Sequence, residues 1–511
     1  MADLQTWQKL QNGSDIRGVA LEGVEGESVN LTPETTYILG QAFVTWLASK
    51  LKIPKADLLV SVGRDSRISG PALMTGLADG MRSLGTNVYY FAIASTPAMF
   101  MSTVTEGYQC DYQCEGAIML TASHLPFNRN GLKFFTAQGG LNKSDISEIL
   151  QLASKNEFLT APEVGDLESR DFISVYTHGL VQKIRQAVNH PDNYEQPLKG
   201  LHIVVDAGNG AGGFYADKVL KPLGADTTCS QFLAPDGHFP NHIPNPENEQ
   251  AMAAIRSAVL DNKADFGIIF DTDVDRSAAV DSQGQELNRN RLIALISAVV
   301  LREHPGSTIV TDSITSDGLA QFIEGLGGVH HRFKRGYKNV INEAQRLNAA
   351  GQESWLAIET SGHGAMKENY FLDDGAYLVS KLLVELAIAR QSGRLVTDLI
   401  AELKEPAESQ EFRLKILAED FKAHGNAVIQ QLHNFVADQE DWQVVPINYE
   451  GIRVACISPD EDGWFLLRLS LHDPVLPLNI ESNVANGVGQ IKRQLLSFFK
   501  QIDGLELSSI Q

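Results

Sequence analysis

Three aspartates at alternate positions are the feature of this sequence that most directly suggests chemistry. They are Asp271, Asp273 and Asp275, and the apolar run 266–270 precedes them. Three carboxylates held close together repel one another strongly unless a cation lies between them, and oxygen ligands suit a hard cation such as Mg²⁺. Three ligands leave room for an outside oxygen, as a magnesium site acting on phosphate requires. An EF-hand is excluded, because Arg276 replaces its glycine and its twelfth position holds serine.

A second candidate for chemistry is a serine, Ser123, which follows the apolar run 116–120. His124 comes directly after it, and Lys133 lies shortly downstream in Asn-Gly-Leu-Lys. A serine just after the carboxyl end of a buried strand, beside a histidine, can act as a nucleophile. The hydrolase pattern Gly-x-Ser-x-Gly is absent, so an esterase-type elbow is not indicated. Taken alone, the segment also fits a capped turn.

Both candidates lie where strands of an α/β fold are expected to end. Short Val- and Ile-rich runs recur, and most lead into Gly, Asp or Ser and then a helical pattern such as 70–84. Because the runs lack polar alternation, we expect strands buried on both faces and sheets covered by helices. Polar residues at strand ends are where such sheets bind ligands. The runs are 58–62, 116–120, 202–205, 266–270, 309–310 and 355–358.

The C-terminal region has a different pattern, which favours a small α+β domain. We expect a helix at 412–435, strands at 453–457, 464–469 and 475–481, and a closing helix at 483–499. Candidate seams between domains are 157–171, 189–199, 283–289 and 403–411. The predicted domains are 1–170, 171–290, 291–405 and 406–511.

Composition excludes several classes of function. Forty-two Lys and Arg against 63 Asp and Glu give a formal charge of −21, which argues against a general nucleic-acid binder. Four cysteines are too few for a disulfide framework. No apolar stretch approaches the ~18 residues of a membrane span, and no signal-peptide pattern is visible. We therefore expect a cytoplasmic protein, a monomer or small homo-oligomer, without nucleic-acid or membrane partners.

Taken together, these segments resemble the α-D-phosphohexomutases, most closely the bacterial phosphomannomutase/phosphoglucomutase branch. That family shares a Thr-x-Ser-His-Asn-Pro loop with a phosphoserine and an Asp-Gly-Asp-x-Asp-Arg magnesium loop. Similar segments occur here in the same order, with Leu125 in place of the usual Asn. The resemblance implies an α/β fold of three similar mixed-sheet α/β domains plus a C-terminal α+β phosphate-binding lid domain around a central cleft. The first α/β domain would carry the phosphoserine, the second would bind the metal and the third would bind the sugar.

The resemblance also assigns roles to the residues around these two loops. It implies that Ser123 carries the phosphoryl group and, with Asp271, Asp273 and Asp275, holds Mg²⁺. His363 is a candidate general acid/base because the intrinsic pKa of histidine lies near working pH. Arg17 lies in an Asp-Ile-Arg-Gly segment of the family. The full set of implied catalytic residues is Ser123, His124, Lys133, Arg17, Arg276 and His363.

The implied substrate-binding residues are spread along the chain. Arg64 lies in the family segment Gly-Arg-Asp-Ser-Arg. The run Glu-Thr-Ser-Gly-His looks like the family's sugar loop, in which Glu359 and Ser361 would bind adjacent hydroxyls. Lys334 and Tyr337 occupy the contact positions of the loop that orients the sugar.

The phosphate loop of the fourth domain departs from the family pattern. Arg468 and Ser470 match the expected Arg-x-Ser, whereas Leu471 and His472 replace the usual Asn-Thr. A histidine can still donate to phosphate, but a leucine side chain cannot. We expect Arg468, Ser470 and His472 to bind the phosphate that does not react.

These features predict a Mg²⁺-dependent phosphohexomutase. It would interconvert hexose 1-phosphate and hexose 6-phosphate, of glucose or mannose, through a phosphoserine and a hexose 1,6-bisphosphate. Two alternatives stay open: a glucose-1,6-bisphosphate synthase, which the altered phosphate loop favours, and a catalytically inactive sugar-phosphate-binding protein. An NAD-dependent oxidoreductase is a further alternative, because 208–213 fits Gly-x-Gly-x-x-Gly, although a tight strand-to-helix turn explains that segment.

Overall fold

The structure is a computed structural model that describes residues 3–107, 111–470 and 473–511. Contacts within the chain divide it into two compact units. The first unit comprises Met1–Leu292 and Ser361–Asp398, and the second comprises Ile293–Thr360 and Leu399–Gln511. The two loops that carry the proposed chemistry both belong to the first unit.

The largest sheet of the first unit has eight strands in the order β1-β2-β6-β5-β3-β4-β8, with β7 paired to β6. Its inner strands β3, β4 and β5 run parallel, whereas β6 runs antiparallel to both β5 and β2. The strands are β1 (Gln11–Asn12), β2 (Asp15–Val19), β3 (Leu59–Arg64), β4 (Asn87–Ile93), β5 (Gly116–Leu120), β6 (Arg129–Thr136), β7 (Gly139–Gly140) and β8 (Leu167–Ser169).

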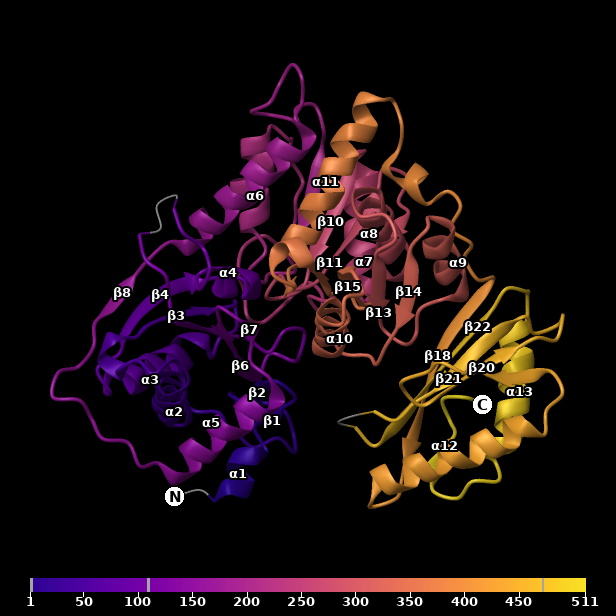
Figure 1. Ribbon diagram of the computed structural model, residues 1–511, viewed down its shortest axis with the longest axis horizontal. Coiled ribbons are helices and arrows are strands. Elements are labelled where there is room, and N and C mark those ends of the chain that lie inside the picture. The colour runs from indigo at the N-terminus through magenta and orange to yellow at the C-terminus, as the bar shows by residue number, and fades with distance from the viewer. Residues whose placement is uncertain (1–2, 108–110, 471–472) are drawn as a thin grey trace. The chain divides into compact units, whose positions relative to one another are not determined.

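Helices cover this sheet and supply most of its core. Helix α2 packs closely against α3 and α5, and its apolar side chains join those of β3 and β5 in one buried cluster (Figure 1). Helix α2 begins after Thr32, whose side chain accepts from the Thr35 amide, with Pro33 in its first turn. The helices are α1 (Leu4–Gln8), α2 (Pro33–Leu51), α3 (Gly70–Arg82), α4 (Thr96–Met101), α5 (Lys143–Lys155) and α6 (Phe172–Val188).

A second, four-stranded sheet of the first unit has the order β12-β11-β10-β9. Strands β9 and β10 are parallel, and β10 turns back into β11 as an antiparallel hairpin. Helices α6 and α11 lie side by side, and α11 also packs on β10 and β11 (Figure 1). The sheet comprises β9 (Ile203–Asp206), β10 (Phe266–Phe270), β11 (Ser277–Asp281) and β12 (Glu286–Leu287), and α7 (Glu249–Asn262) precedes β10. The first unit also contains β16 (Gly364–Met366) and β17 (Leu372–Asp373), which pair antiparallel with each other, and α11 (Gly375–Gln391).

The second unit contains two groups of strands. Strands β13, β14 and β15 are parallel, so their carboxyl ends share one edge. The other group is an antiparallel sheet in the order β19-β20-β21-β22-β18-β23. The first group comprises β13 (Thr308–Thr311), α9 (Asp317–Gly325), β14 (Val329–Arg332), α10 (Tyr337–Ala349) and β15 (Ser354–Ile358), preceded by α8 (Arg289–Glu303), which spans the unit boundary.

The C-terminal sheet packs against two helices, α12 and α13 (Figure 1). Its core is a cluster of buried aliphatic and aromatic side chains drawn from both helices and five strands. The elements are β18 (Glu408–Ile416), α12 (Phe421–Ala437), β19 (Trp442–Val444), β20 (Ile452–Cys456), β21 (Gly463–Leu467), β22 (Val475–Ser482), α13 (Gly487–Phe499) and β23 (Leu505–Glu506).

One expected helix begins in the wrong place. The predicted helix at 412–435 starts inside β18, and α12 begins only at Phe421. Phe412, Leu414 and Ile416 are buried while the residues between them are exposed, which is the period-two pattern of a half-buried strand. The Asp420 side chain then caps α12 by accepting from the Ala423 amide. The helical pattern of the following segment concealed this short alternation.

The predicted fold class is confirmed: three α/β segments with mixed sheets are followed by a C-terminal α+β sheet domain. Every residue of β5, β9 and β10 is buried, as expected for runs without polar alternation. The predicted domain boundaries and the central cleft stay predictions. Among the described residues, no helix is both long and apolar enough to cross a membrane.

Candidate active site

The loop that carries Ser123 follows β5 directly. Ser123 has φ +50, in the left-handed region that residues other than glycine seldom adopt, and only 5% of the residue is exposed. Its amide donates to the Thr121 hydroxyl over 2.9 Å. A tight, buried turn therefore fixes the serine at the end of the strand. Unusual backbone conformations of this kind concentrate at functional sites.

A fully buried arginine, Arg67, holds this loop in place. Its guanidinium donates to the backbone carbonyls of Ser123, Leu125 (2.6 Å) and Pro126 (2.7 Å). Asp65 lies 3.3 Å from the Arg67 Nε and neutralises the buried charge. Burial raises the pKa of Asp65 to about 6, although Arg67 opposes that rise. Only Arg64 of this segment is predicted from the sequence, and the role of Arg67 is not.

The three aspartates converge in the turn between β10 and β11. Carboxylate oxygens of Asp271, Asp273 and Asp275 all lie within 4.8 Å of one another. Val274 lies between the last two with φ +66, an outlier for a β-branched residue. This left-handed residue curls the loop so that the alternate carboxylates face one another. The structure thus brings together the three residues that the sequence predicts as metal ligands.

The chemistry of this cluster fits a divalent cation. The Oδ1 atoms of Asp273 and Asp275 are buried and have no hydrogen-bond partner among the described residues. Burial, and then the neighbouring carboxylates of Asp275 and Asp273, raise the pKa of Asp271 well above its usual value. Anionic oxygens that are buried, close together and incompletely paired are stabilised by a cation with oxygen preference.

Lys133, on β6, supplies a positive charge to the same cluster. Its Nζ lies 3.1 Å from Asp273 Oδ2 and also donates to Asp275. Burial would raise the pKa of Asp275, but Lys133, His363 and Arg276 together hold it below its usual range. Thr96 at the start of α4 donates to the same Asp273 oxygen as Lys133. Strand β6 and helix α4 of the first sheet thus reach the aspartate turn.

Arg276 links the serine to the aspartates. Its Nη2 donates to Ser123 Oγ over 2.7 Å and to Asp271 Oδ2 over 3.2 Å. Ser123 Oγ donates in turn to the same Asp271 oxygen over 2.9 Å. Although burial opposes it, the surrounding carboxylates raise the pKa of Arg276, which keeps its charge. An anionic group on Ser123 would meet a guanidinium already in place.

His124 accepts a hydrogen bond from Arg276. Its Nδ1 lies 2.7 Å from Arg276 Nη2 and 3.4 Å from Ser123 Oγ. Burial, followed by the charge of Arg276, lowers the pKa of His124 to about 2. The imidazole is therefore neutral at physiological pH, and its Nδ1 accepts the guanidinium N–H. The residue orients Arg276 beside the serine.

His363 behaves in the opposite way. Its backbone pairs with Arg276, and its Nδ1 contacts Asp373 and lies 3.9 Å from Asp275 Oδ1. Burial alone would lower its pKa, but Asp373 and Asp275 raise it to about 9. His363 is thus positively charged in this structure. Ser361, two residues earlier, is also buried in the first unit.

Two further predicted residues flank the serine loop. Arg17 on β2 lies opposite Gly131 of β6 and pairs with Asp15 at 3.0 Å. Arg64 is the last residue of β3, opposite the last residue of β5, and its Nε donates to the Tyr90 hydroxyl over 2.9 Å. The eleven predicted site residues of the first unit therefore come from β2, β3, β6 and the loops after β5, β10 and β15: Arg17, Arg64, Ser123, His124, Lys133, Asp271, Asp273, Asp275, Arg276, Ser361 and His363.

The second unit holds the remaining described predictions. Glu359 follows β15 and accepts from the Gly336 amide over 2.5 Å. Lys334 is exposed in the loop after β14, and Tyr337 is the first residue of α10. Lys334 and Tyr337 follow β14, and Glu359 follows β15, so all three come after the carboxyl ends of strands that flank β13, where α/β folds bind ligands.

The predicted phosphate loop follows β21. The Arg468 and Ser470 amides donate to Pro477 and Val475 carbonyls at 3.1 Å, and Ser470 Oγ accepts from the Asp473 amide. Burial lowers the pKa of Arg468, and Glu450 is the main group that opposes this shift. The predicted ligand His472, with Leu471, lies outside the described residues.

A loop that the sequence reasoning did not single out also reaches Arg276. Asn245 accepts from Arg276 Nη1 over 3.1 Å. His242, in the same loop, contacts both Asp206 oxygens at 3.0 and 3.1 Å. Burial would lower the pKa of His242, but hydrogen bonding to Asp206 and its charge raise it. The sequence of this loop, rich in Asn and Pro, does not by itself predict a functional role. The role of Asn245 depends on its contact with Arg276, which is distant in the sequence.

The glycine-rich segment 208–213 packs against the turn that carries Asp271, Asp273 and Asp275. A Cβ on Gly210 would lie 2.6 Å from the Thr272 carbonyl oxygen, and the Ala211 amide donates to that oxygen over 2.8 Å. Gly210 therefore permits its backbone to lie close to that of Thr272, as expected for a tight strand-to-helix turn.

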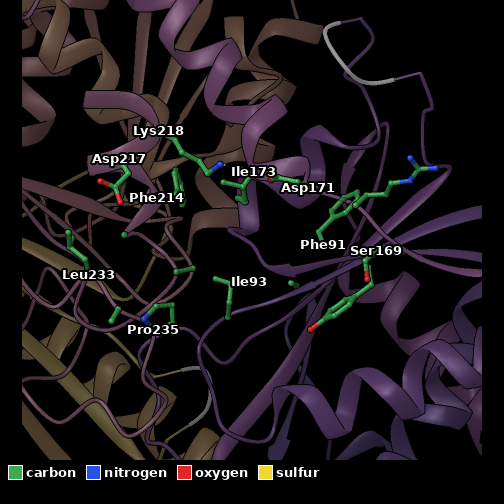
Figure 2. Close-up of a pocket in the computed structure, with 16 residues that line it drawn as sticks. Phe91, Ile93, Ser169, Asp171, Ile173, Phe214, Asp217, Lys218, Leu233 and Pro235 are labelled. Carbon is green, nitrogen blue, oxygen red and sulfur yellow. Dashed lines mark ion pairs between the residues drawn. The ribbon is translucent and has the colours of Figure 1, made fainter. Parts of the chain in front are cut away.

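An open groove of about 770 Å³ lies beside this segment in the first unit (Figure 2). Its walls are mainly apolar, with Phe91 and Ile93 of β4 on one side and Phe214 and Leu233 on another. Lys218 and Asp171 form an ion pair at 3.6 Å on its rim. The predicted site residues do not line this groove in the described part of the chain.

Comparison with known proteins identifies one family along most of the chain. Residues 8–160, 176–284 and 288–406 match phosphoglucomutase/phosphomannomutase alpha/beta/alpha domains I, II and III respectively. The three matches occur in the family's order.

Individual relatives agree with this match. The chain is 30% identical to a phosphomannomutase/phosphoglucomutase of Pseudomonas putida over 94% of each chain. It is 28% identical to a phosphoglucomutase of Neisseria meningitidis, again over 94% of each. A crystal structure of a phosphoglucomutase/phosphomannomutase family protein from Burkholderia thailandensis aligns over 98% of both chains, with a TM-score of 0.76 and 27% identity. The chain is therefore a phosphotransferase of the mutase type and belongs to the phosphoglucomutase/phosphomannomutase family within the α-D-phosphohexomutase superfamily.

Proposed function

We propose that this protein interconverts hexose 1-phosphate and hexose 6-phosphate through a phosphoryl group carried on Ser123. The observation that carries the proposal is the position of Ser123 Oγ, which contacts Arg276 at 2.7 Å and Asp271 at 2.9 Å. The nucleophile, a fixed guanidinium and the aspartate cluster thus meet at one buried point. The relatives named phosphoglucomutase and phosphomannomutase support hexose phosphates, of glucose or mannose, as substrates.

We further propose that the ion is Mg²⁺, held by Asp271, Asp273, Asp275 and an oxygen of the phosphate on Ser123. When bound, Mg²⁺ would offset charge on the phosphoryl oxygens and polarise the phosphorus. Lys133 would balance the remaining negative charge of the cluster, because it already contacts two of the three carboxylates. Oxygen-only ligands and bound phosphate are typical of magnesium rather than of softer metals.

The transfer itself breaks one P–O bond and forms another. A sugar hydroxyl oxygen attacks the phosphorus, and the bond from phosphorus to Ser123 Oγ breaks. The hydroxyl loses its proton, and Ser123 Oγ gains one. Arg276 binds the transferring phosphoryl oxygens in this step, where preorganised charge is most effective. The resulting hexose 1,6-bisphosphate then returns its other phosphoryl group to Ser123.

His363 is the residue that we propose exchanges protons with the reacting groups. The pKa of about 9 means that it holds a proton at neutral pH in this structure. It therefore enters as an acid, which can donate when Ser123 Oγ leaves, and becomes a base in the return step. His124 stays neutral and orients Arg276, because its pKa is lowered to about 2.

The experiment that tests this function follows sugar phosphates by phosphorus NMR. Purified protein with Mg²⁺ should convert glucose 1-phosphate or mannose 1-phosphate into the corresponding 6-phosphate. Ser123→Ala should lose several orders of magnitude in rate, whereas Ser144→Ala, at an exposed serine in the first turn of α5, should keep wild-type activity. Net accumulation of hexose bisphosphate with no isomerisation would instead support the synthase. A fully active Ser123→Ala enzyme would refute the mechanism.

A further inference from the structure

A glutamate that no step of the proposed mechanism uses lies next to the proposed phosphate-binding arginine. Glu450 Oε2 accepts from the Ser313 hydroxyl over 2.6 Å and from the Arg335 amide over 3.1 Å. Its other oxygen lies 3.9 Å from Arg468 Nη1. All four residues belong to the second unit. The Glu450 carboxylate thus contacts the same kinds of groups that bind a phosphate: a hydroxyl, a backbone amide and a guanidinium.

The backbone places this carboxylate firmly. Glu450 lies in the turn before β20, and Asn448 Nδ2 donates to the carbonyls of Glu450 and Gly451 over 2.8 and 3.0 Å. Gly451 has φ +56, and a Cβ there would lie 2.1 Å from the Leu467 carbonyl oxygen. The turn therefore requires glycine at that position, and this requirement together with the Asn448 hydrogen bonds defines the backbone around Glu450.

Its partners lie at the ligand-binding edge of the parallel strands. Ser313 follows β13, and Arg335 follows β14 and precedes α10. The next amide along, that of Gly336, donates to Glu359 over 2.5 Å. Two consecutive amides before a helix thus point to carboxylates, in a position where helix dipoles and strand ends favour anions.

The Arg468 guanidinium is not saturated by Glu450. At 3.9 Å the contact is an ion pair too long for a hydrogen bond, and Arg468 Nε is buried without a hydrogen-bond partner among the described residues. The side chains of Arg468 and Glu450 are only 11% and 14% exposed. The arginine therefore keeps donors for an incoming anion, while its charge is already partly neutralised.

We propose that Glu450 is an internal competitor of the substrate phosphate and sets how tightly Arg468 holds it. The proposal rests on the proposed function, in which Arg468 binds the phosphate that does not react. A phosphate bound by Arg468 would displace the carboxylate or bind against its negative charge. Either way, Glu450 weakens binding and favours release. A mutase needs such release. Its bisphosphate intermediate must dissociate one phosphate from Arg468 and rebind with the other phosphate at Arg468.

The sign of one substitution separates this role from simple support of Arg468. Glu450→Gln keeps the size of the side chain and its acceptor oxygen for Ser313 and Arg335, but removes the charge. If Glu450 competes with phosphate, the variant binds the anion more tightly, by about tenfold as expected for removal of one nearby like charge. If Glu450 only supports Arg468, the variant binds the anion more weakly.

The test measures equilibrium binding of glucose 6-phosphate and of inorganic phosphate by calorimetry. It uses the full chain with Mg²⁺ in a Ser123→Ala background, which prevents turnover. Glu450→Gln and Glu450→Ala should both lower the Kd, and Glu506→Gln, which removes a surface charge of β23, should not. Arg468→Ala should raise the Kd and abolish the gain from Glu450→Gln.

Each outcome has one meaning. An unchanged or higher Kd in Glu450→Gln, with Arg468→Ala still weakening binding, overturns the competitor role and leaves the proposed function intact. Unchanged binding in Arg468→Ala overturns the phosphate role of Arg468, and the competitor role with it. In active enzyme, Glu450→Gln should lower KM, and it should also lower kcat if release limits turnover.

Discussion

Replacing Lys133 by methionine should destabilise the metal-depleted protein in a pH-dependent way. Lys133 Nζ is the buried cation between Asp273 and Asp275, at 3.1 Å from the former. At an effective dielectric constant of about 20, one such pair is worth about 5 kcal/mol. Measured losses on breaking buried ion pairs are about 3–5 kcal/mol. Methionine keeps most of the side-chain volume, so the loss reports the charge.

Proton uptake limits this loss. A carboxyl with the ordinary pKa of 3.8 can escape an unpaired charge by binding a proton. At about 1.36 kcal/mol per pH unit, that costs about 5 kcal/mol at pH 7.5 and about 1.6 kcal/mol at pH 5. Lys133 holds the Asp275 pKa low, so wild type keeps this carboxylate charged at both pH values and loses the pair only as pH falls below 3.8, whereas the unpaired carboxyl of the variant can bind a proton at pH 5. The free energy of unfolding of metal-depleted Lys133→Met should therefore be lower than that of wild type by about 3–5 kcal/mol at pH 7.5 and by under about 2 kcal/mol at pH 5.

Hydrogen exchange in the presence of a chelator measures this locally, at the amides of β6, β10 and β11. Lys155→Met, at the exposed end of α5, is the matched control and should change little. Added Mg²⁺ should restore more protection to Lys133→Met than to wild type, because the ion supplies the missing positive charge. A Lys133→Met protein as protected as wild type at pH 7.5, or a loss independent of pH, would refute this reasoning.

Three other substitutions test separate parts of the site. Asp273→Asn should weaken Mg²⁺ binding in calorimetry while Asp261→Asn on α7 does not; equal affinities would exclude the aspartate turn as the metal site. Asn245→Ala should lower kcat/KM by about tenfold or more, the worth of a hydrogen bond to a charged group, whereas Asn241→Ala, which loses a bond to Asn209, should not. The raised pKa of His242 means that its ion pair with Asp206 stabilises fully below about pH 6.5 and less as pH rises through that pKa. The stability difference between wild type and His242→Asn in urea should therefore shrink from pH 6 to pH 9, and a constant difference would contradict the assignment.

Much of the fold could be predicted because its strands are apolar and unbroken. The runs 116–120 and 266–270 coincide with β5 and β10, whose residues are all buried. The same pattern located Ser123 and the three aspartates, since each group directly follows such a strand. The segment at 412–435 was harder, because a half-buried strand and an amphipathic helix follow each other with only the four residues 417–420 between them.

The parts of the site that the sequence did not reveal depend on contacts between distant residues. Arg67 and Asn245 are ordinary polar residues in turns until the fold brings them to the serine loop and to Arg276. Asp373 gains a role only through His363, whose pKa it raises. The left-handed conformation of Val274 has no signal in residue type, because a β-branched side chain disfavours it. Such features follow from tertiary packing rather than from local pattern.

The most direct test of the central claim is to locate the transferred phosphoryl group. The protein is incubated with Mg²⁺ and ³²P-labelled glucose 1,6-bisphosphate, then digested, and the labelled peptide is identified by mass spectrometry. The label should lie on Ser123 alone and should pass to glucose 6-phosphate or glucose 1-phosphate when these are added. A label on another residue, or a label on Ser123 that added hexose monophosphate does not remove, would contradict a transfer through this serine.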